Sequence, residues 1–241
     1  MLSNPSEIVA PRLMKRLPDI YFTKVASSAA SVFSLTPRQV ALWKSQQGPH
    51  SSDWLRVMPI SGLGQTMRTY RCVLSYRLGV ALFPLSNLCS SCSRVFDGDV
   101  FGDHAVSCAG MVGIKHRHNL VRDTLLDICF RSGISASKEV DIGLVDESGR
   151  SLRPADLFLY AWDRGQDVCV DLTGSSPLTR SGLSDFVPGQ VVVEAAKRKC
   201  AKYRDLCAGK GYGFLPFSFS SLGELDADVV AFLNRVWGVS S

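Results

Sequence analysis

Two apolar runs joined by a short polar turn are the feature that most constrains how this chain folds. They lie in "SLRPADLFLYAWDRGQDVCVDLTGSS", residues 151–176, and they resemble the two strands of a β-hairpin. With "DRGQ" (163–166) as the turn, Asp171 lies opposite Phe158 on the neighbouring strand. Asp156 shares that face, one diagonal step away, so the two carboxylates are predicted to lie about 5–7 Å apart.

Two like charges at that distance, half buried, are unfavourable unless a positive group lies between them. A divalent cation held by oxygen ligands, most simply Mg²⁺, would satisfy both carboxylates. The helix predicted from Pro188 adds a cation, because Lys199 borders its apolar stripe and can reach inward, whereas Lys197 lies about 200° around the helix. Two acids, a metal and a lysine suit phosphodiester hydrolysis. The alternative is a buried Asp–Lys or Asp–Arg network, with Arg153 nearby, that has no catalytic role.

A cysteine-rich block over residues 86–110 carries a second chemical pattern. It reads C-x2-C, then eleven residues, then H-x3-C, and zinc fingers close a tetrahedron from two short ligand pairs of this kind. All four positions would be filled by protein, so we expect a structural zinc site with no position for a reacting water. The alternative is four unrelated residues in a polar loop. The expected ligands are Cys89, Cys92, His104 and Cys108, and the residues that could replace one of them are Cys72, His116 and His118.

Composition limits the cellular compartment and the kinds of partner expected for the protein. No apolar run reaches the about 18 residues of a membrane span, and the N-terminus shows no secretory signal, so no membrane partner is expected. Eight cysteines then indicate a reducing compartment with metal-bound or buried thiols. The net charge is only +5, but basic residues gather at 115–122 and 197–204. Such clusters are either solvated helix faces or contacts to phosphates.

The chain is predicted to be an α/β protein in four parts. Upstream, Thr36 and Pro37 start one helix and Gly79 stops another. From residue 116 the pattern becomes regular, with a helix over 116–133, a strand over 137–145, the hairpin, a helix from 188 to 209 or 211, a strand over 212–222 and a helix over 226–237. The four parts are a poorly defined segment (1–50), a helical linker (51–85), the zinc knuckle (86–110) and an α-β-β-β-α-β domain (111–241).

Three short motifs add a family resemblance. "RPAD", "VCVDLTG" and "AAKRKCAKY" resemble the restriction-like endonuclease of non-LTR retrotransposons, a branch of the PD-(D/E)XK nuclease superfamily. In that branch a CCHC knuckle and an arginine-histidine-asparagine segment, here "RHN" at 117–119, precede a core of order α-β-β-β-α-β. The sequence departs from the superfamily pattern in two places, because Ala155 separates proline from aspartate and Thr173 stands where many relatives keep lysine. The retrotransposon branch has moved that lysine onto the following helix, which accounts for the threonine.

Carried over residue by residue, the resemblance assigns a site. It implies Asp156 and Asp171 as ligands of a catalytic Mg²⁺ or Mn²⁺ ion, and Lys199 and Tyr203 as further catalytic residues. Glu139 on the first strand would be an additional metal or water contact. The basic residues expected to contact nucleic acid are Arg117, His118, Arg122, Arg153, Lys197, Arg198 and Lys202.

The expected function is therefore a metal-dependent endodeoxyribonuclease of the nucleus that nicks target DNA, with the RNA of the element as a second candidate partner. The chain has no reverse transcriptase motifs, so we interpret it as a fragment of such an element or as a host gene derived from one. One alternative is a zinc-containing DNA-binding module whose nuclease has decayed. A purely structural zinc protein is the other.

Overall fold

The computed structural model describes residues 20–48 except 22, 26 and 30, residue 51, and residues 67–83, 88–94, 99–146, 148–178 and 186–239. The beginning of the predicted segment 1–50 and most of the predicted linker upstream of residue 67 lie outside these ranges. Among the residues described, no helix combines the length and the apolar character that crossing a membrane requires.

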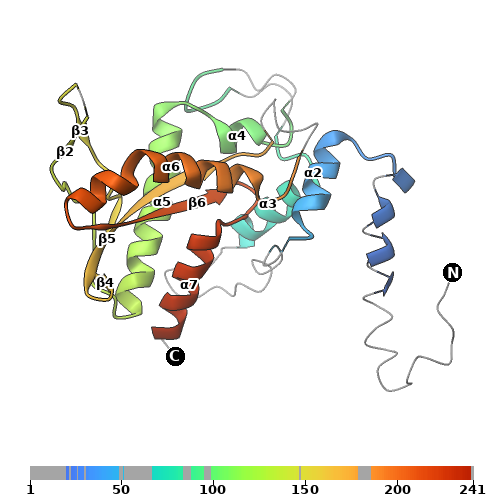
Figure 1. Ribbon diagram of the computed structural model, residues 1–241. Coiled ribbons are helices and arrows are strands. Elements are labelled where there is room, and N and C mark those ends of the chain that lie inside the picture. The colour runs from blue at the N-terminus through green and yellow to red at the C-terminus, as the bar shows by residue number, and fades with distance from the viewer. Residues whose placement is uncertain are drawn as a thin grey trace, which may run out of the picture.

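The centre of the molecule is a four-stranded mixed sheet (Figure 1). Its strands, in spatial order, are β1 (Ala136–Lys138), β4 (Leu157–Asp163), β5 (Gln166–Ser175) and β6 (Gly213–Ser220). β1, β4 and β5 are antiparallel neighbours, whereas β6 runs parallel to β5. A parallel return requires a long crossover, which the helix α6 (Gln190–Gly209) supplies. The predicted α/β class is confirmed.

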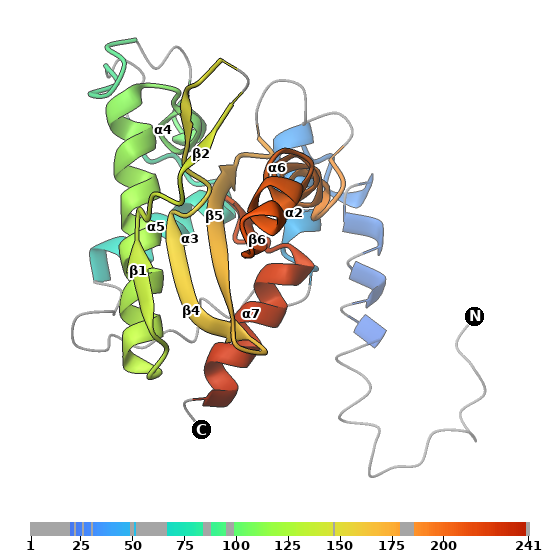
Figure 2. The same cartoon turned by 60° about the vertical axis from the view of Figure 1, so that its left-hand side comes forward.

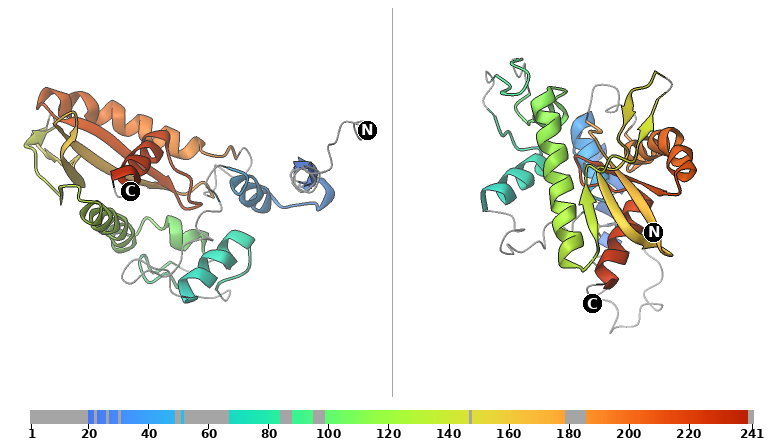
Figure 3. Two further views of the ribbon diagram at one scale, coloured as in Figure 1. Left: turned by 90° about the horizontal axis from the view of Figure 1, so that it is seen from below. Right: turned by 90° about the vertical axis from the view of Figure 1, so that its left-hand side faces the viewer.

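Helices cover both faces of this sheet (Figure 3, left). α6 lies on one face, and α5 (Met111–Arg131) and α7 (Ala227–Val239) lie on the other. Because successive side chains of a strand point to opposite faces, each strand of the hairpin contributes to both layers. The face toward α5 and α7 carries the predicted apolar set of Leu157, Leu159, Val168, Val170 and Leu172. The face toward α6 carries Phe158 and Cys169, packed with Tyr203 and Cys207.

The β4–β5 hairpin closes at the predicted turn but in a different register. Both central residues of "DRGQ" have positive φ, 52° and 84°, as a two-residue hairpin turn of this kind requires. Strand β4 then bulges between Leu159 and Asp163, which leaves extra residues unpaired on that strand. Phe158 consequently pairs with Cys169, so the prediction that it pairs with Asp171 is wrong by two residues.

The single strand predicted over 137–145 is also wrong, because the chain turns at Glu139. This residue has φ of 53°, a left-handed conformation that ends β1, and its N–H donates to the Asp156 carbonyl at 3.0 Å. The rest of the predicted strand leaves the central sheet. Its last two residues form β2 (Leu144–Val145), which pairs with β3 (Ser151–Leu152) in a separate small hairpin.

The upstream helix signals are confirmed. Thr36 caps the helix α2 (Pro37–Ser45), accepting the Gln39 N–H while the Gln39 side chain accepts the Thr36 N–H. The helix α3 (Met67–Leu78) ends at Gly79, which has φ of 69°.

The helices α2 and α3 pack against the C-terminal half of the chain (Figures 1 and 2). Arg77 at the end of α3 donates to the carbonyls of Ser51 and Leu222. The helices α2 and α3 therefore belong to the same folded body as the sheet. The shared apolar cluster consists of Ala41, Leu42, Tyr76, Leu178, Phe186 and Leu222.

Candidate functional site

The register of β4 and β5 brings the two aspartates of the hairpin opposite each other. Leu157 pairs with Val170, and continuing this pairing by one residue sets Asp156 opposite Asp171. Directly opposite residues have Cβ atoms about 4.5–5.5 Å apart, which is closer than a diagonal pair. Asp156 precedes the strand, and its Oδ2 accepts the Leu172 N–H at 2.7 Å. The Asp156 carboxylate therefore serves as an acceptor for the β5 backbone where β4 begins.

The alanine that interrupts the expected proline-aspartate motif does not separate the two acids. Ala155 is only 1% exposed and packs in the apolar cluster on the α6 side of the sheet, together with Phe158. Asp156 follows it, directly before the first residue of β4, and its carboxylate is directed to β5.

Asp171 is the buried member of the pair. Its side chain is 4% exposed, and Lys199 Nζ lies 2.7 Å from its Oδ2. This contact lacks the direction of a hydrogen bond, so we regard it as an ion pair. Burial raises the pKa of Asp171 to about 6, with Lys199 opposing the rise and the charge of Asp156 adding to it. Lys199 therefore reaches Asp171, as predicted, whereas Lys197 is exposed on the same helix.

Asp156 has a second partner that the sequence did not assign to it. His118 Nε2, from α5, lies 3.1 Å from Asp156 Oδ2. This contact with the Asp156 carboxylate is the main cause of a raised pKa for His118, which partial burial opposes. The sequence proposed His118 as a nucleic-acid contact or a substitute zinc ligand, and the structure places it at the acid pair. The signal that could have found it is the four-residue spacing of His118 and Arg122, which sets both on one face of the helix.

Tyr203 lies beneath the lysines of α6. Its ring is buried and packs on Phe214 with 5.8 Å between ring centroids. Lys199 Nζ lies 5.6 Å and Lys202 Nζ 4.7 Å from the Tyr203 ring centroid, within range of cation–π attraction. Tyr203 thus lies at the predicted cluster, where its ring contacts two lysine ammonium groups. The remaining predicted nucleic-acid contacts on exposed positions are Arg153, Lys197, Arg198 and Lys202.

Two arginines predicted to contact nucleic acid are instead engaged inside the protein. Arg122, with a side chain only 6% exposed, pairs with the carboxylates of Asp123 and Glu139. Arg117 donates to the Cys108 carbonyl at 2.7 Å. Because both guanidinium groups have partners within the protein, we do not assign them to phosphates. Glu139, predicted as an extra metal contact, directs its carboxylate to Arg122 rather than to the acid pair.

The four predicted zinc ligands come together at one point. Their ligand atoms all lie within 4.8 Å of one another, with Cys89 Sγ 3.7 Å from Cys108 Sγ and Cys92 Sγ 3.3 Å from His104 Nε2. Zinc bonds of 2.0–2.3 Å in a tetrahedron imply S···S and S···N edges of about 3.8 and 3.5 Å. The cluster therefore fits a metal ion such as zinc. A hydrogen bond from the Ser91 backbone is the main reason that the pKa of Cys89 falls to about 6, which favours the thiolate that binds metal.

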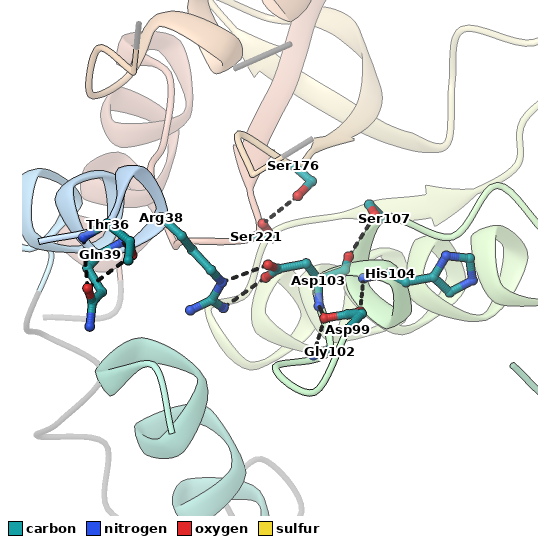
Figure 4. Close-up of polar contacts among 10 residues, drawn as sticks. All are labelled: Thr36, Arg38, Gln39, Asp99, Gly102, Asp103, His104, Ser107, Ser176 and Ser221. Atoms are coloured by element: carbon teal, nitrogen blue, oxygen red, sulfur yellow. Dashed lines mark hydrogen bonds and ion pairs between the residues drawn. The ribbon is translucent and has the colours of Figure 1, made fainter. Parts of the chain in front are cut away.

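A carboxylate orders the half of the knuckle that carries His104 (Figure 4). Asp99 accepts the backbone N–H groups of Gly102, Asp103 and His104 and so starts the short helix α4 (Asp103–Ser107). Arg38 of α2 binds the Asp103 carboxylate through two bonds of 2.7 and 2.9 Å. Sequence reasoning missed this bidentate pair, because its members lie 65 positions apart in the chain.

The other half of the knuckle holds the beginning of α5. Ser91 Oγ accepts the Gly113 N–H at 2.8 Å, and a side chain at Gly110 or Gly113 would collide with Ser91. Ser91 thereby caps a helix that has no side-chain cap of its own. This is why α5 begins at Met111, earlier than the predicted residue 116.

Comparison of the chain with protein-family models and with curated proteins finds no match.

Proposed function

We propose that this chain contains a Mg²⁺-dependent endodeoxyribonuclease domain of the restriction-like type, similar to that of non-LTR retrotransposons, which nicks DNA in the nucleus. The observation that carries the proposal is a buried carboxylate, Asp171, with Asp156 opposite it and Lys199 against it, at one end of a mixed sheet. The strands of the central sheet and their helices support it, since α5, β1, β4, β5, α6 and β6 follow the α-β-β-β-α-β order of the family that the motifs resemble, with the separate β2–β3 hairpin inserted after β1. The parallel pairing of the last strand supports it as well.

The donor atoms of the acid pair fit a hard divalent cation. Asp171 Oδ2 is buried and has no directed hydrogen bond, although Lys199 lies close to it. Within the described ranges no hydrogen bond reaches Asp156 Oδ1, whereas Oδ2 has two partners. Carboxylate oxygens without a directed hydrogen bond are ligands that Mg²⁺ prefers, and water molecules complete its coordination shell. When bound, the cation would polarise a phosphate oxygen and lower the pKa of a bound water.

The protein supplies the positive charge around that centre. Lys199 offsets the charge of Asp171 in the free protein and, at the same position, can stabilise the charge that develops on a reacting phosphate. The Tyr203 ring limits where Lys199 and Lys202 lie. Exposed Lys197 and Arg198 on α6 then bind the DNA backbone without regard to sequence, and such contacts weaken as salt rises.

The test is nicking of supercoiled plasmid by the purified zinc-loaded chain in Mg²⁺ or Mn²⁺. Asp171→Asn should lower the nicking rate by at least about 100-fold, as loss of a transition-state charge contact does. Lys199→Met should have a comparable effect, and Lys197→Met is the matched control on the same helix. We expect that control to change DNA affinity and its salt dependence but to leave the maximal rate nearly unchanged.

The outcomes separate the proposal from its alternative. Nicking that persists in Asp171→Asn, or that survives chelation of Mg²⁺, contradicts the assigned site. Tight DNA binding in gel shifts with no cleavage under any metal condition would instead favour the DNA-binding module. Equal effects of the two lysine substitutions would show that Lys199 acts only as a surface charge.

A further inference from the structure

The helix α5 places a side chain at the acid pair that a scheme of two aspartates and one lysine does not use. His118 is 31% exposed and its Nε2 lies 3.1 Å from Asp156 Oδ2. Lys199 meets Asp171 from α6, on the opposite face of the sheet. The two acids are thus contacted from both helical layers, with a separate basic partner for each.

The contacts of Asp156 are unequal between its two oxygens. Oδ2 accepts the Leu172 N–H at 2.7 Å and also faces His118 Nε2. A hydrogen bond and an ion pair on the same oxygen restrict the carboxylate more than either contact alone. In the part of the chain that the structure describes, Oδ1 accepts no hydrogen bond. The oxygen held by the protein and the oxygen left for another ligand are therefore different atoms.

His118 is itself held by its neighbours on α5. The preceding residue, Arg117, donates to the carbonyls of Ala105 and Cys108 in the knuckle. One turn later, buried Arg122 pairs with Glu139, whose N–H donates to the Asp156 carbonyl. The helix backbone is thus anchored on both sides of the histidine. A side chain on a backbone fixed in this way loses less conformational freedom when it contacts a partner, so it can orient that partner.

We propose that His118 is a positioning residue that fixes Asp156 as a metal ligand and leaves Oδ1 directed toward the space shared with Asp171. This inference rests on the proposed function, because it assigns His118 a role at the same metal site. Outer partners of this kind orient metal ligands, and their loss commonly lowers metal affinity about 10- to 100-fold.

A competing role for His118 is that of a cation that occupies the metal position. The geometry argues against it, since the contact of His118 at 3.1 Å is to Oδ2, the oxygen that the Leu172 N–H already occupies. The two roles predict opposite results. A positioning residue increases metal affinity, whereas a competing cation decreases it.

The experiment is a Mn²⁺ titration of the zinc-loaded chain followed by electron paramagnetic resonance, without DNA. His118→Leu removes the donor and keeps most of the volume, whereas His118→Gln places an amide N–H near the former Nε2. We expect Mn²⁺ affinity to fall about 10-fold or more in His118→Leu and to recover largely in His118→Gln. His116→Leu is the matched control, because His116 is exposed on the same helix, and it should bind Mn²⁺ like the wild type.

Each outcome decides between the proposals. Wild-type affinity in His118→Leu, no recovery in His118→Gln, or tighter binding in His118→Leu overturns the role of His118 and leaves the endonuclease proposal standing. Mn²⁺ binding that is absent in the wild type, or unchanged by Asp171→Asn, overturns the metal site and the role of His118 with it. Zinc content, measured in every variant, shows whether the knuckle remains intact.

Discussion

Asp171 makes the folded protein less stable than it would be with a neutral side chain at that position. Its pKa rises from 3.8 to about 6, mainly because of burial. Each pKa unit corresponds to about 1.36 kcal/mol, so the ionised carboxylate destabilises the fold by about 3 kcal/mol. Asp171→Asn keeps the shape and removes the charge. We therefore expect the variant to lose nicking while becoming more stable.

The gain in stability of Asp171→Asn should depend on pH in a defined direction. A pKa raised by folding means that the native state binds the proton more tightly, so the contribution of Asp171 is favourable below pH 3.8 and is lost as the pH rises through about 6. The uncharged asparagine does not titrate. The advantage of Asp171→Asn should thus be about 3 kcal/mol at pH 7.5, about 1.6 kcal/mol at pH 5, and should vanish below pH 3.8.

Urea unfolding followed by circular dichroism, with zinc present and Mg²⁺ absent, measures this difference at both pH values. In thermal unfolding the same gain corresponds to a rise in Tm of about 6–12 °C for a chain of this size. Asp205→Asn is the control, because it removes an exposed carboxylate from α6 and should change stability by less than about 0.5 kcal/mol. A gain of equal size at pH 5 and pH 7.5, or no gain at pH 7.5, would refute the reasoning from burial.

Two further predictions concern the knuckle. The wild-type chain should bind one zinc ion at the cysteine–histidine cluster, and Cys92→Ser should lose it to a chelator at far lower concentration, as followed by atomic absorption; full zinc retention in the variant would contradict the ligand set. Gly110→Ala would place its Cβ 2.7 Å from the Ser91 carbonyl oxygen, so it should destabilise the chain by about 1–3 kcal/mol in urea unfolding. Gly209→Ala, with nothing within 4 Å, is its control and should stabilise by about 0.5–1 kcal/mol; a similar effect of both would disprove the close contact.

The features that local chemistry determines were predicted from the sequence. The hairpin turn follows from Gly165, which adopts positive φ without strain, and the zinc ligands follow from two short spacings. Lys199 was distinguished from Lys197 by helical periodicity alone, and the structure agrees. Each of these signals is contained within a few residues of the chain.

The features that the sequence did not predict depend on contacts between distant segments. The bulge in β4 and the left-handed Glu139 interrupt regular strands, and neither position has a glycine from which the irregularity could be predicted. Arg38 and Asp103 meet only after the chain has folded. His118 was noticed in the sequence, but its partner depends on where the knuckle docks the helix.

The bulge in β4 has a consequence for recognising this arrangement in other sequences. Fourteen residues separate Asp156 from Asp171, and the bulge takes up two of them without placing them in the ladder. A shorter chain that lacked those two residues would form a regular hairpin with the same two acids opposite each other, because a change of two preserves the alternation of faces. A change of one residue would turn Asp156 into the apolar layer instead. A search pattern for this acid pair should therefore allow twelve as well as fourteen intervening residues.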